Sequence, residues 1–376
     1  MSILFSPFSL RSLELPNRIV VSPMCQYSAQ EGSAGDWHRA HLGSLALSGA
    51  GLLCIEATAV TPAGRITPGD LGLYSDANEE ALAGVLRMIR AIAPIPVAIQ
   101  LAHAGRKGSS REPWNGGHLL PPSEGGWTPE APSAVAHAPG EAPPRALDED
   151  DLARLRQAFA DASRRAARLG IEAIEVHAAH GYLLHEFLSP VANQRTDRYG
   201  GSLENRMRFP LEIFDAVRAG FPAERPVGMR ISATDWLDDA EPPRESWTLQ
   251  QSLVLARELK ARGCDWIDVS SGGVSPQQKI KPAPGYQVPF AEIIRNEVGV
   301  ATMAVGLITE PRQAEAIVAE GRADLVALAR GMLFDPRWPW RAAAELGGTV
   351  TGPRQYWRAL PREAGAIFGA LTFGQR

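Results

Sequence analysis

Two histidines and a tyrosine lie within six residues of one another, at His177, His180 and Tyr182. They follow a short apolar run, so a strand ending near His177 and a turn after it would bring both imidazole rings to one ligand atom. Two neutral imidazoles, or a pair with one ring charged, suit a carbonyl or phenolate oxygen. Tyr182 adds a transferable proton. The three residues indicate a site for an oxygen-bearing ligand with a proton donor beside it.

Two other interpretations of the histidines stay open at this point. Both rings can be structural, or they can bind a metal in a barrel hydrolase or lyase. A metal site needs further ligands, and all eight histidines lie at or before His185, so the later strands supply none. A Schiff-base mechanism needs a lysine at a strand end, and none of the apolar runs carries one.

Other polar residues also follow apolar runs. Gly306 lets backbone N–H groups approach an anion and Arg330 supplies a fork-shaped cation, which predicts a phosphate site. The alternative interpretation is that Gly306 is only a turn residue and that the Arg330 side chain is solvated. Gln100 and Arg230 can bracket a planar heterocycle, and a buried guanidinium needs a partner. Two interpretations of Cys25 stay open: it is a nucleophile, or it is a small buried side chain.

The strands and helices that carry these residues are predicted to form a single (β/α)8 barrel. Eight near-continuous apolar runs, typical of parallel strands covered on both faces, begin near Ile19, Gly51, Pro96, Ile171, Pro226, Cys264, Val300 and Asp324. Helical patterns lie between them, with Asp148 and Thr248 as predicted N-caps. The run 195–202 predicts a structural loop with Ser202 as the N-cap of the next helix. A barrel needs about 250 residues. The remainder predicts an N-terminal cap at 1–18, a Pro- and Gly-rich lid-like insertion at 111–146 after the third strand, and a C-terminal tail at 337–376.

Composition limits the class of protein. A hydrophobic fraction of 45% excludes general disorder, and a net charge of −4 gives no reason to expect nucleic acid or an anionic membrane as a partner. Three widely spaced cysteines predict neither disulfides nor a cysteine zinc site. No apolar run approaches the roughly 18 residues of a membrane span, and the N-terminus lacks a signal-peptide pattern. A reducing cytoplasmic location is the expectation.

The whole chain also resembles one family. The segments that carry the resemblance are SPMCQYS at 22–28, IEATAV at 55–60, QLAHAGRK at 100–107, EVHAAHGYLLHEFLSP at 175–190, NQRTDRYGGSLENRMRF at 193–209 and GRADLVALARG at 321–331. In this order they resemble the old yellow enzymes, which are FMN-containing ene-reductases on a (β/α)8 barrel. Cys25 with Tyr27 resembles the thermophilic-like xenobiotic-reductase branch.

The resemblance implies a role for each candidate residue. The residues it places around the flavin ring are Ser22, Pro23, Met24, Cys25, Ala57, Gln100 and Arg230, and those at the FMN phosphate are Gly306, Ala329 and Arg330. Arg230 would stabilise the anionic reduced flavin. His177 and His180 would bind the substrate carbonyl, Tyr182 would protonate the α-carbon, and Tyr27 and Cys25 would touch substrate.

The resemblance also implies a ping-pong reaction. NADPH or NADH reduces FMN, and flavin N5 then passes the hydride to the β-carbon of an activated alkene, with nitro compounds or quinones as further acceptors. No G-x-G-x-x-G follows a strand, which agrees with transient nicotinamide binding. A non-catalytic FMN redox sensor is the alternative within the same resemblance, beside the metal-dependent hydrolase or lyase.

Two segments outside the barrel core concern access to the site. Trp114, His118 and Trp127 in the insertion at 111–146 can line a substrate lid. The tail segment 355–358 resembles one that reaches the active site of a partner subunit, so Arg358 is expected to contribute across the interface of a homodimer or of a dimer of dimers.

Overall fold

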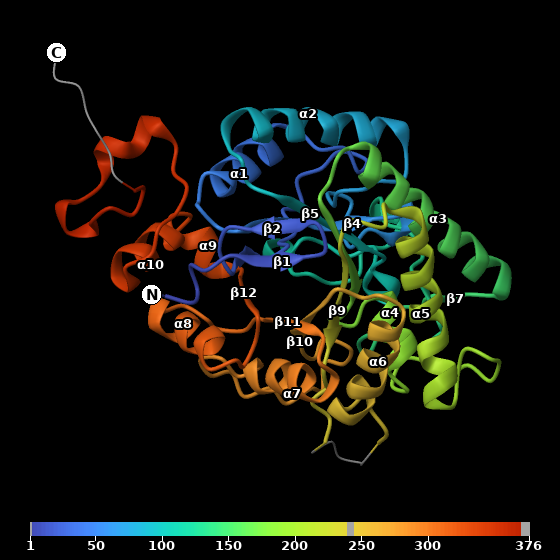
Figure 1. Ribbon diagram of the computed structural model, residues 1–376. Coiled ribbons are helices and arrows are strands. Elements are labelled where there is room, and N and C mark those ends of the chain that lie inside the picture. Colours follow the sequence, from blue (N-terminus) through green and yellow to red (C-terminus); the bar gives the residue numbers. More distant parts are fainter. Residues whose placement is uncertain (1, 239–243, 370–376) are drawn as a thin grey trace.

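The computed structural model describes residues 2–238 and 244–369. Each of the eight apolar runs forms one strand of a closed parallel barrel (Figure 1). In order around the barrel, the strands are β3 Ile19–Val21, β4 Leu52–Ala59, β5 Val97–Ala102, β8 Ala173–Ala178, β9 Val227–Ser232, β10 Trp266–Ser270, β11 Ala301–Ala304 and β12 Leu325–Leu328. The last strand, β12, pairs with the first, β3, and this pairing closes the barrel. The pairing of β9 with β10 joins its middle strands. The (β/α)8 prediction is confirmed.

Helices surround the strands in Figure 1 and cover the outer face of the barrel, while side chains of the strands fill its interior. The helices are α1 Asp36–Ala46, α2 Asp76–Ile92, α3 Glu149–Arg168, α4 Leu183–Leu188, α5 Leu203–Gly220, α6 Leu249–Ala261, α7 Val288–Val298, α8 Pro311–Ala319, α9 Arg330–Phe334 and α10 Trp338–Leu346. The three predicted N-caps are confirmed, because Asp148, Ser202 and Thr248 each accept a hydrogen bond from the backbone N–H three residues on.

The predicted N-terminal cap is an antiparallel hairpin of β1 Phe8–Leu10 and β2 Leu13–Leu15. Its leucines belong to the same buried cluster as inward-facing strand residues such as Val20, Leu52 and Trp266. The barrel interior is packed solid at this end, since a Cβ added to Gly228 would lie 2.2 Å from the Trp266 ring. A ligand therefore has access only from the carboxyl ends of the strands.

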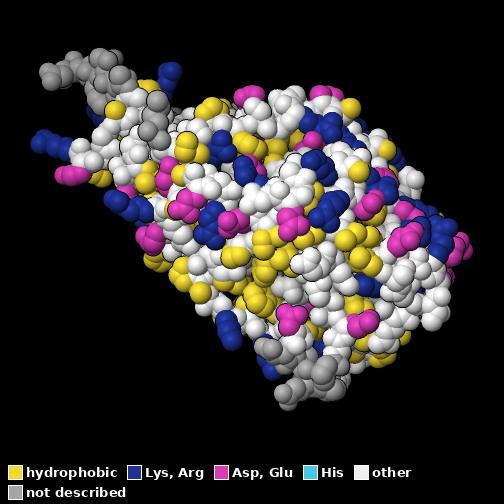
Figure 2. All heavy atoms as spheres, turned by 60° about the horizontal axis from the view of Figure 1, so that its bottom comes forward, with side chains coloured by type: hydrophobic (Ala, Val, Ile, Leu, Met, Phe, Trp, Pro, Cys, Tyr) yellow, Lys and Arg dark blue, Asp and Glu magenta, His cyan; other side chains and the backbone are white. Residues whose placement is uncertain are grey.

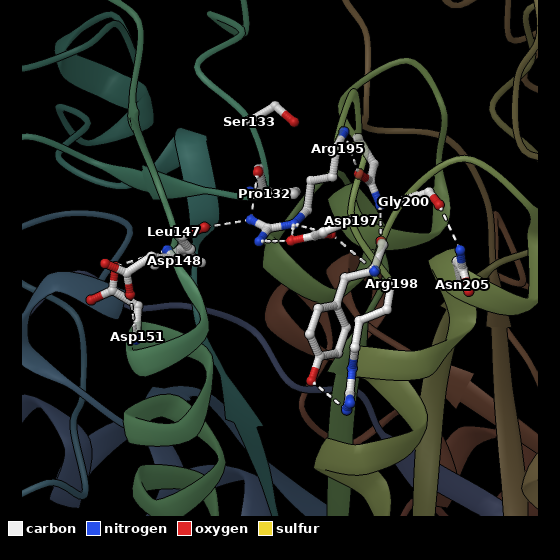
Figure 3. A network of polar contacts seen from close by, with 12 residues as sticks. Pro132, Ser133, Leu147, Asp148, Asp151, Arg195, Asp197, Arg198, Gly200 and Asn205 are labelled. Carbon is white, nitrogen blue, oxygen red and sulfur yellow. Dashed lines mark hydrogen bonds and ion pairs between the residues drawn. The ribbon is translucent and has the colours of Figure 1, made fainter.

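The segment after β5 contains a short parallel pair, β6 Glu130–Ala131 and β7 Arg145–Ala146, and the 3₁₀ turns η2 Gly105–Lys107, η3 Pro113–Asn115 and η4 Pro122–Glu124. Arg195 ties the base of this segment to the loop before α5. Figure 3 shows its guanidinium between Asp197 and the carbonyl oxygens of Pro132 and Leu147, to which it donates hydrogen bonds. The prediction of a structural loop at 195–202 is confirmed.

The remaining 3₁₀ turns are η1 Pro62–Gly64, η5 Arg354–Ala359 and η6 Arg362–Ala364. The face drawn in Figure 2 has acidic and basic side chains interspersed, in keeping with the small net charge. None of the helices in residues 2–238 and 244–369 is long and apolar enough to cross a membrane.

Candidate active site

The structure brings His177, His180 and Tyr182 together at the carboxyl end of β8. The two imidazole rings are 5.2 Å apart between centroids and nearly perpendicular, and the Tyr182 ring lies 5.0 Å from that of His177. His177 is the next-to-last residue of β8, and Tyr182 is the N-cap of α4. The three side chains converge in the structure, as the sequence predicted.

Both histidines are neutral at physiological pH. Burial lowers the pKa of each ring well below its usual value, and the nearby Arg230 guanidinium lowers it further. His177 Nδ1 accepts a hydrogen bond from the Ala179 N–H at 3.2 Å, so its proton is on Nε2. His177 therefore presents an N–H donor to the site, which suits an electron-rich oxygen.

The turn after β8 holds His180 in an unusual conformation, with φ at +59°. Three elements fix it. The His180 N–H donates to Ser232 Oγ at 2.9 Å, and the His180 carbonyl accepts from Lys107 Nζ at 2.9 Å. Gly181 must be glycine, because a Cβ there would lie 2.1 Å from the Gly273 carbonyl oxygen and φ is +73°. The turn is built by contacts with β9, β10 and the segment after β5.

Cys25 and Tyr27 follow β3 and lie close to Tyr182, since each disfavours ionisation of the Tyr182 phenol. Burial, with the carboxylates of Asp70 and Glu56, raises the pKa of the Cys25 thiol well above its usual value. A thiol held in its protonated form is a poor nucleophile. Cys25 is half-buried, and its protonated thiol argues against the interpretation of Cys25 as a nucleophile.

Gln100 and Arg230 are buried on β5 and β9, the strands on either side of β8. Gln100 Nε2 donates to Glu175 Oε1 at 2.8 Å, and Arg230 Nε is 3.1 Å from Asp268 Oδ2. Asp268 is thus the partner that a buried guanidinium requires. His177 and Arg230 are direct neighbours across β8 and β9, so the cationic group stands next to the histidine pair.

The other predicted cofactor residues lie on neighbouring strand ends. Ser22, Pro23 and Met24 leave β3, and Ala57 of β4 pairs with Gln100 of β5. The Ser22 hydroxyl is buried, and it forms no hydrogen bond with any of the described residues.

Gly306 and Ala329 follow the adjacent strands β11 and β12, and Arg330 begins α9 with an exposed side chain. The predicted phosphate residues therefore share one edge of the barrel mouth.

The segment at 111–146 supplies one aromatic ring near the site. Trp114 lies edge-on to Tyr27 with 5.6 Å between ring centroids. His118 instead accepts from Arg111 Nε at 3.1 Å, and Trp127 Nε1 donates to the Ala63 carbonyl at 3.0 Å. Of the three residues considered for a lid, the structure brings only Trp114 to a predicted substrate contact.

The C-terminal tail lies against α10. The Tyr356 ring is 6.3 Å from that of Trp340, and the Arg337 guanidinium is stacked on both rings. Arg358 is exposed on η5. Its contribution to a partner subunit stays a prediction.

Four residues of the site were missed by sequence reasoning. Glu175, Ser270 and Lys107 each form a hydrogen bond with a predicted site residue, and Asp268 forms an ion pair with Arg230. Lys107 had a usable signal, as one of only four lysines and the one nearest a strand end. Glu175 lies within β8, and Asp268 and Ser270 lie within β10, where the surrounding apolar residues gave no sign of which side chain each would contact.

A (β/α)8 barrel with buried donors, a phenol and a cation gathered at its strand ends has the architecture of an enzyme active site. Residues 3–347 match the model of the NADH:flavin oxidoreductase / NADH oxidase family. The chain is 44% identical over 359 residues to an NADPH dehydrogenase of Geobacillus sp. (strain WCH70), covering 95% of this chain and 98% of that protein. It is 41% identical over 357 residues to an NADPH dehydrogenase of Bacillus subtilis (strain 168), covering 94% and 98%.

A solved structure of morphinone reductase in complex with tetrahydroNAD is similar with a TM-score of 0.73 at 30% identity, covering 93% of this chain and 92% of that one. The chain belongs to the NADH:flavin oxidoreductase family, of the old yellow enzyme type. It is an FMN-containing NADPH dehydrogenase that uses NAD(P)H as hydride donor and acts on small molecules. Membership of this family rules against the interpretation of the chain as a metal-dependent hydrolase or lyase. Among the described residues, no three His, Cys, Asp or Glu side chains are grouped to hold a metal ion.

Proposed function

We propose that the protein reduces the C=C bond of α,β-unsaturated carbonyl compounds, with nitro compounds and quinones as further acceptors. The observation that carries the proposal is the pair of neutral histidines with a protonated phenol beside them, 5.2 Å and 5.0 Å apart between ring centroids. Two N–H donors on a carbonyl oxygen draw electron density away from the conjugated β-carbon, which makes that carbon a hydride acceptor.

Bound FMN would supply the redox chemistry, which is hydride transfer from NADPH to the alkene. The residues proposed to hold its ring are Ser22, Pro23, Met24, Cys25, Ala57, Gln100 and Arg230, and those at its phosphate are Gly306, Ala329 and Arg330. Two observations support the fit: the Ser22 hydroxyl is buried without a partner in the described residues, and the Arg230 charge is buried at the barrel mouth. Arg230 would favour an anionic ring beside it.

Tyr182 completes the addition. Burial, reinforced by Cys25 and Tyr27, raises the pKa of its phenol well above the usual value, so the proton stays on oxygen until a strong base forms. The α-carbon becomes such a base once the β-carbon has taken the hydride. The π bond breaks, the new C–H bond at the α-carbon uses the Tyr182 proton, and solvent restores the phenol.

Tyr182→Phe tests the proposal. NADPH oxidation that leaves the flavin reduced should continue in the variant, while 2-cyclohexenone reduction should fall by about 10²–10⁴-fold, the contribution of a positioned general acid. Tyr27→Phe is the matched control, because it removes a second phenol of the same site and should raise KM more than it lowers kcat. Unchanged enone turnover in Tyr182→Phe would show that Tyr182 is not the acid.

We also propose a cytoplasmic homodimer or dimer of dimers, in which Arg358 enters the neighbouring active site. The support is the position of the tail, which packs on α10 through Tyr356 and leaves Arg358 exposed.

A further inference from the structure

The ring of His180 has an anchor that differs from that of His177. His180 Nε2 lies 2.7 Å from the hydroxyl oxygen of Ser270, the last residue of β10. His177 is instead held at Nδ1 by the Ala179 N–H. The ring nitrogens left to a ligand are thus Nε2 of His177 and Nδ1 of His180.

The direction of the Ser270 hydrogen bond decides what His180 can do. If the hydroxyl donates to Nε2, the neutral ring carries its proton on Nδ1 and offers a second N–H donor. If the ring donates to the hydroxyl, Nδ1 presents a lone pair, which repels a carbonyl oxygen. Only the first arrangement lets both histidines donate to the same oxygen atom.

The surroundings of Ser270 favour the first arrangement. The other acceptor near its hydroxyl is Gln287 Oε1 at 3.4 Å, the outer limit for a hydrogen bond. That oxygen already accepts from Ser271 Oγ at 2.5 Å, and Gln287 is oriented by donation from its Nε2 to the Val305 carbonyl at 3.0 Å. The Ser270 proton therefore has its better acceptor, at the shorter distance, in His180.

The backbone on either side supports this arrangement. Ser270 pairs directly with Ser232 across β9 and β10, and Ser232 Oγ accepts from the His180 N–H while donating to the Gly272 carbonyl at 2.8 Å. The two serines therefore hold the main chain and the ring of His180 from adjacent strands.

We infer that Ser270 is a positioning residue that holds His180 as its Nδ1–H tautomer, so that His177 and His180 donate together to one ligand oxygen. The inference rests on the proposed function for its catalytic meaning. The tautomer itself is a property of the protein without substrate.

The experiment compares Ser270→Ala with Ser271→Ala in the FMN-loaded enzyme. Ser271 is the matched control, because its hydroxyl lies one residue away and bonds Gln287 rather than His180. Two-bond ¹H–¹⁵N spectra of histidine-labelled protein report which ring nitrogen is protonated, and loss of signals in His180→Asn assigns them. Absorbance titration with 4-nitrophenol measures binding of a phenolate oxygen.

We expect Nδ1–H at His180 in the wild type and in Ser271→Ala, and a shift toward Nε2–H in Ser270→Ala. Affinity for 4-nitrophenol should fall about 10–100-fold in Ser270→Ala only, as for the loss of one hydrogen bond to a charged group. Ser270→Thr, which keeps the hydroxyl, should restore both readouts. Ser270→Cys keeps the size but donates weakly, and it replaces the alanine variant if that variant does not fold.

An unchanged His180 tautomer in Ser270→Ala, or an equal loss of affinity in Ser271→Ala, would overturn the inference. Failure of this inference can be distinguished from failure of the proposed function. A wild type that has the expected tautomers and binds 4-nitrophenol, yet does not reduce enones, would refute the proposed substrate and leave the role of Ser270 intact.

Discussion

Replacing Gly181 by alanine tests whether close contact between two turns holds the active site in place. An added Cβ would lie 2.1 Å from the Gly273 carbonyl oxygen, and ordinary contact begins at 3.4 Å, so the turns must separate by 3.4 − 2.1, or about 1.3 Å. Both partners are backbone, which cannot rotate away as a flexible side chain can. Gly181 stands between His180 and Tyr182, so any movement displaces both.

The magnitude follows from two separable costs. A left-handed φ costs an L-residue about 1–2 kcal/mol of folding free energy, and crowding of packed groups adds about 1–3 kcal/mol. Gly201 has a φ of +79°, close to the +73° of Gly181, but nothing lies within 4 Å of its Cβ position. Gly201→Ala should therefore lose about 1–2 kcal/mol and Gly181→Ala about 2–5 kcal/mol.

The two variants are compared by urea unfolding and by steady-state reduction of 2-cyclohexenone. A displacement near 1 Å in a reacting group costs roughly 10²-fold in rate, so kcat/KM should fall by that factor in Gly181→Ala and stay unchanged in Gly201→Ala. Equal stability losses in the two variants, with activity retained in both, would show that the Gly273 contact does not position the site.

Two further predictions concern the buried acid under η2 and the tail. Burial raises the pKa of Glu186 to about 8, whereas in the unfolded chain it ionises near 4.5. The free energy of unfolding should therefore decrease from about pH 5 to pH 8, by at most about 1.4 kcal/mol per pH unit from this group. Glu186→Gln should show a shallower decrease in urea unfolding across that range, and an identical slope would contradict the assignment. Truncation after Pro353 should lower the oligomer mass in light scattering and raise KM, and unchanged values of both would exclude the proposed role of Arg358.

The fold was predictable because its signals are local. Each strand is a short apolar run, and helix starts such as Asp148 and Thr248 carry their own capping oxygen three residues before the N–H that they bind. The site was predictable where its parts are neighbours in sequence, as His177, His180 and Tyr182 are. Arg230 was recognised as needing a partner, but nothing in the sequence pointed to Asp268, because the pairing of β9 with β10 that joins them follows from the closed barrel.

The same limit explains why the tautomers could not be read from the sequence. His177 takes its proton position from Ala179, two residues away, whereas the hydroxyl at His180 Nε2 comes from Ser270, 90 residues further along the chain. Gly273 closes the arrangement, because its own Cβ would lie 2.4 Å from the His180 backbone. The end of β10 and the loop after it therefore contact His180 twice, at the ring through Ser270 and at the main chain through Gly273. A change in residues 270–273 should alter ligand binding at the histidine pair, although the sequence assigned none of them to that pair.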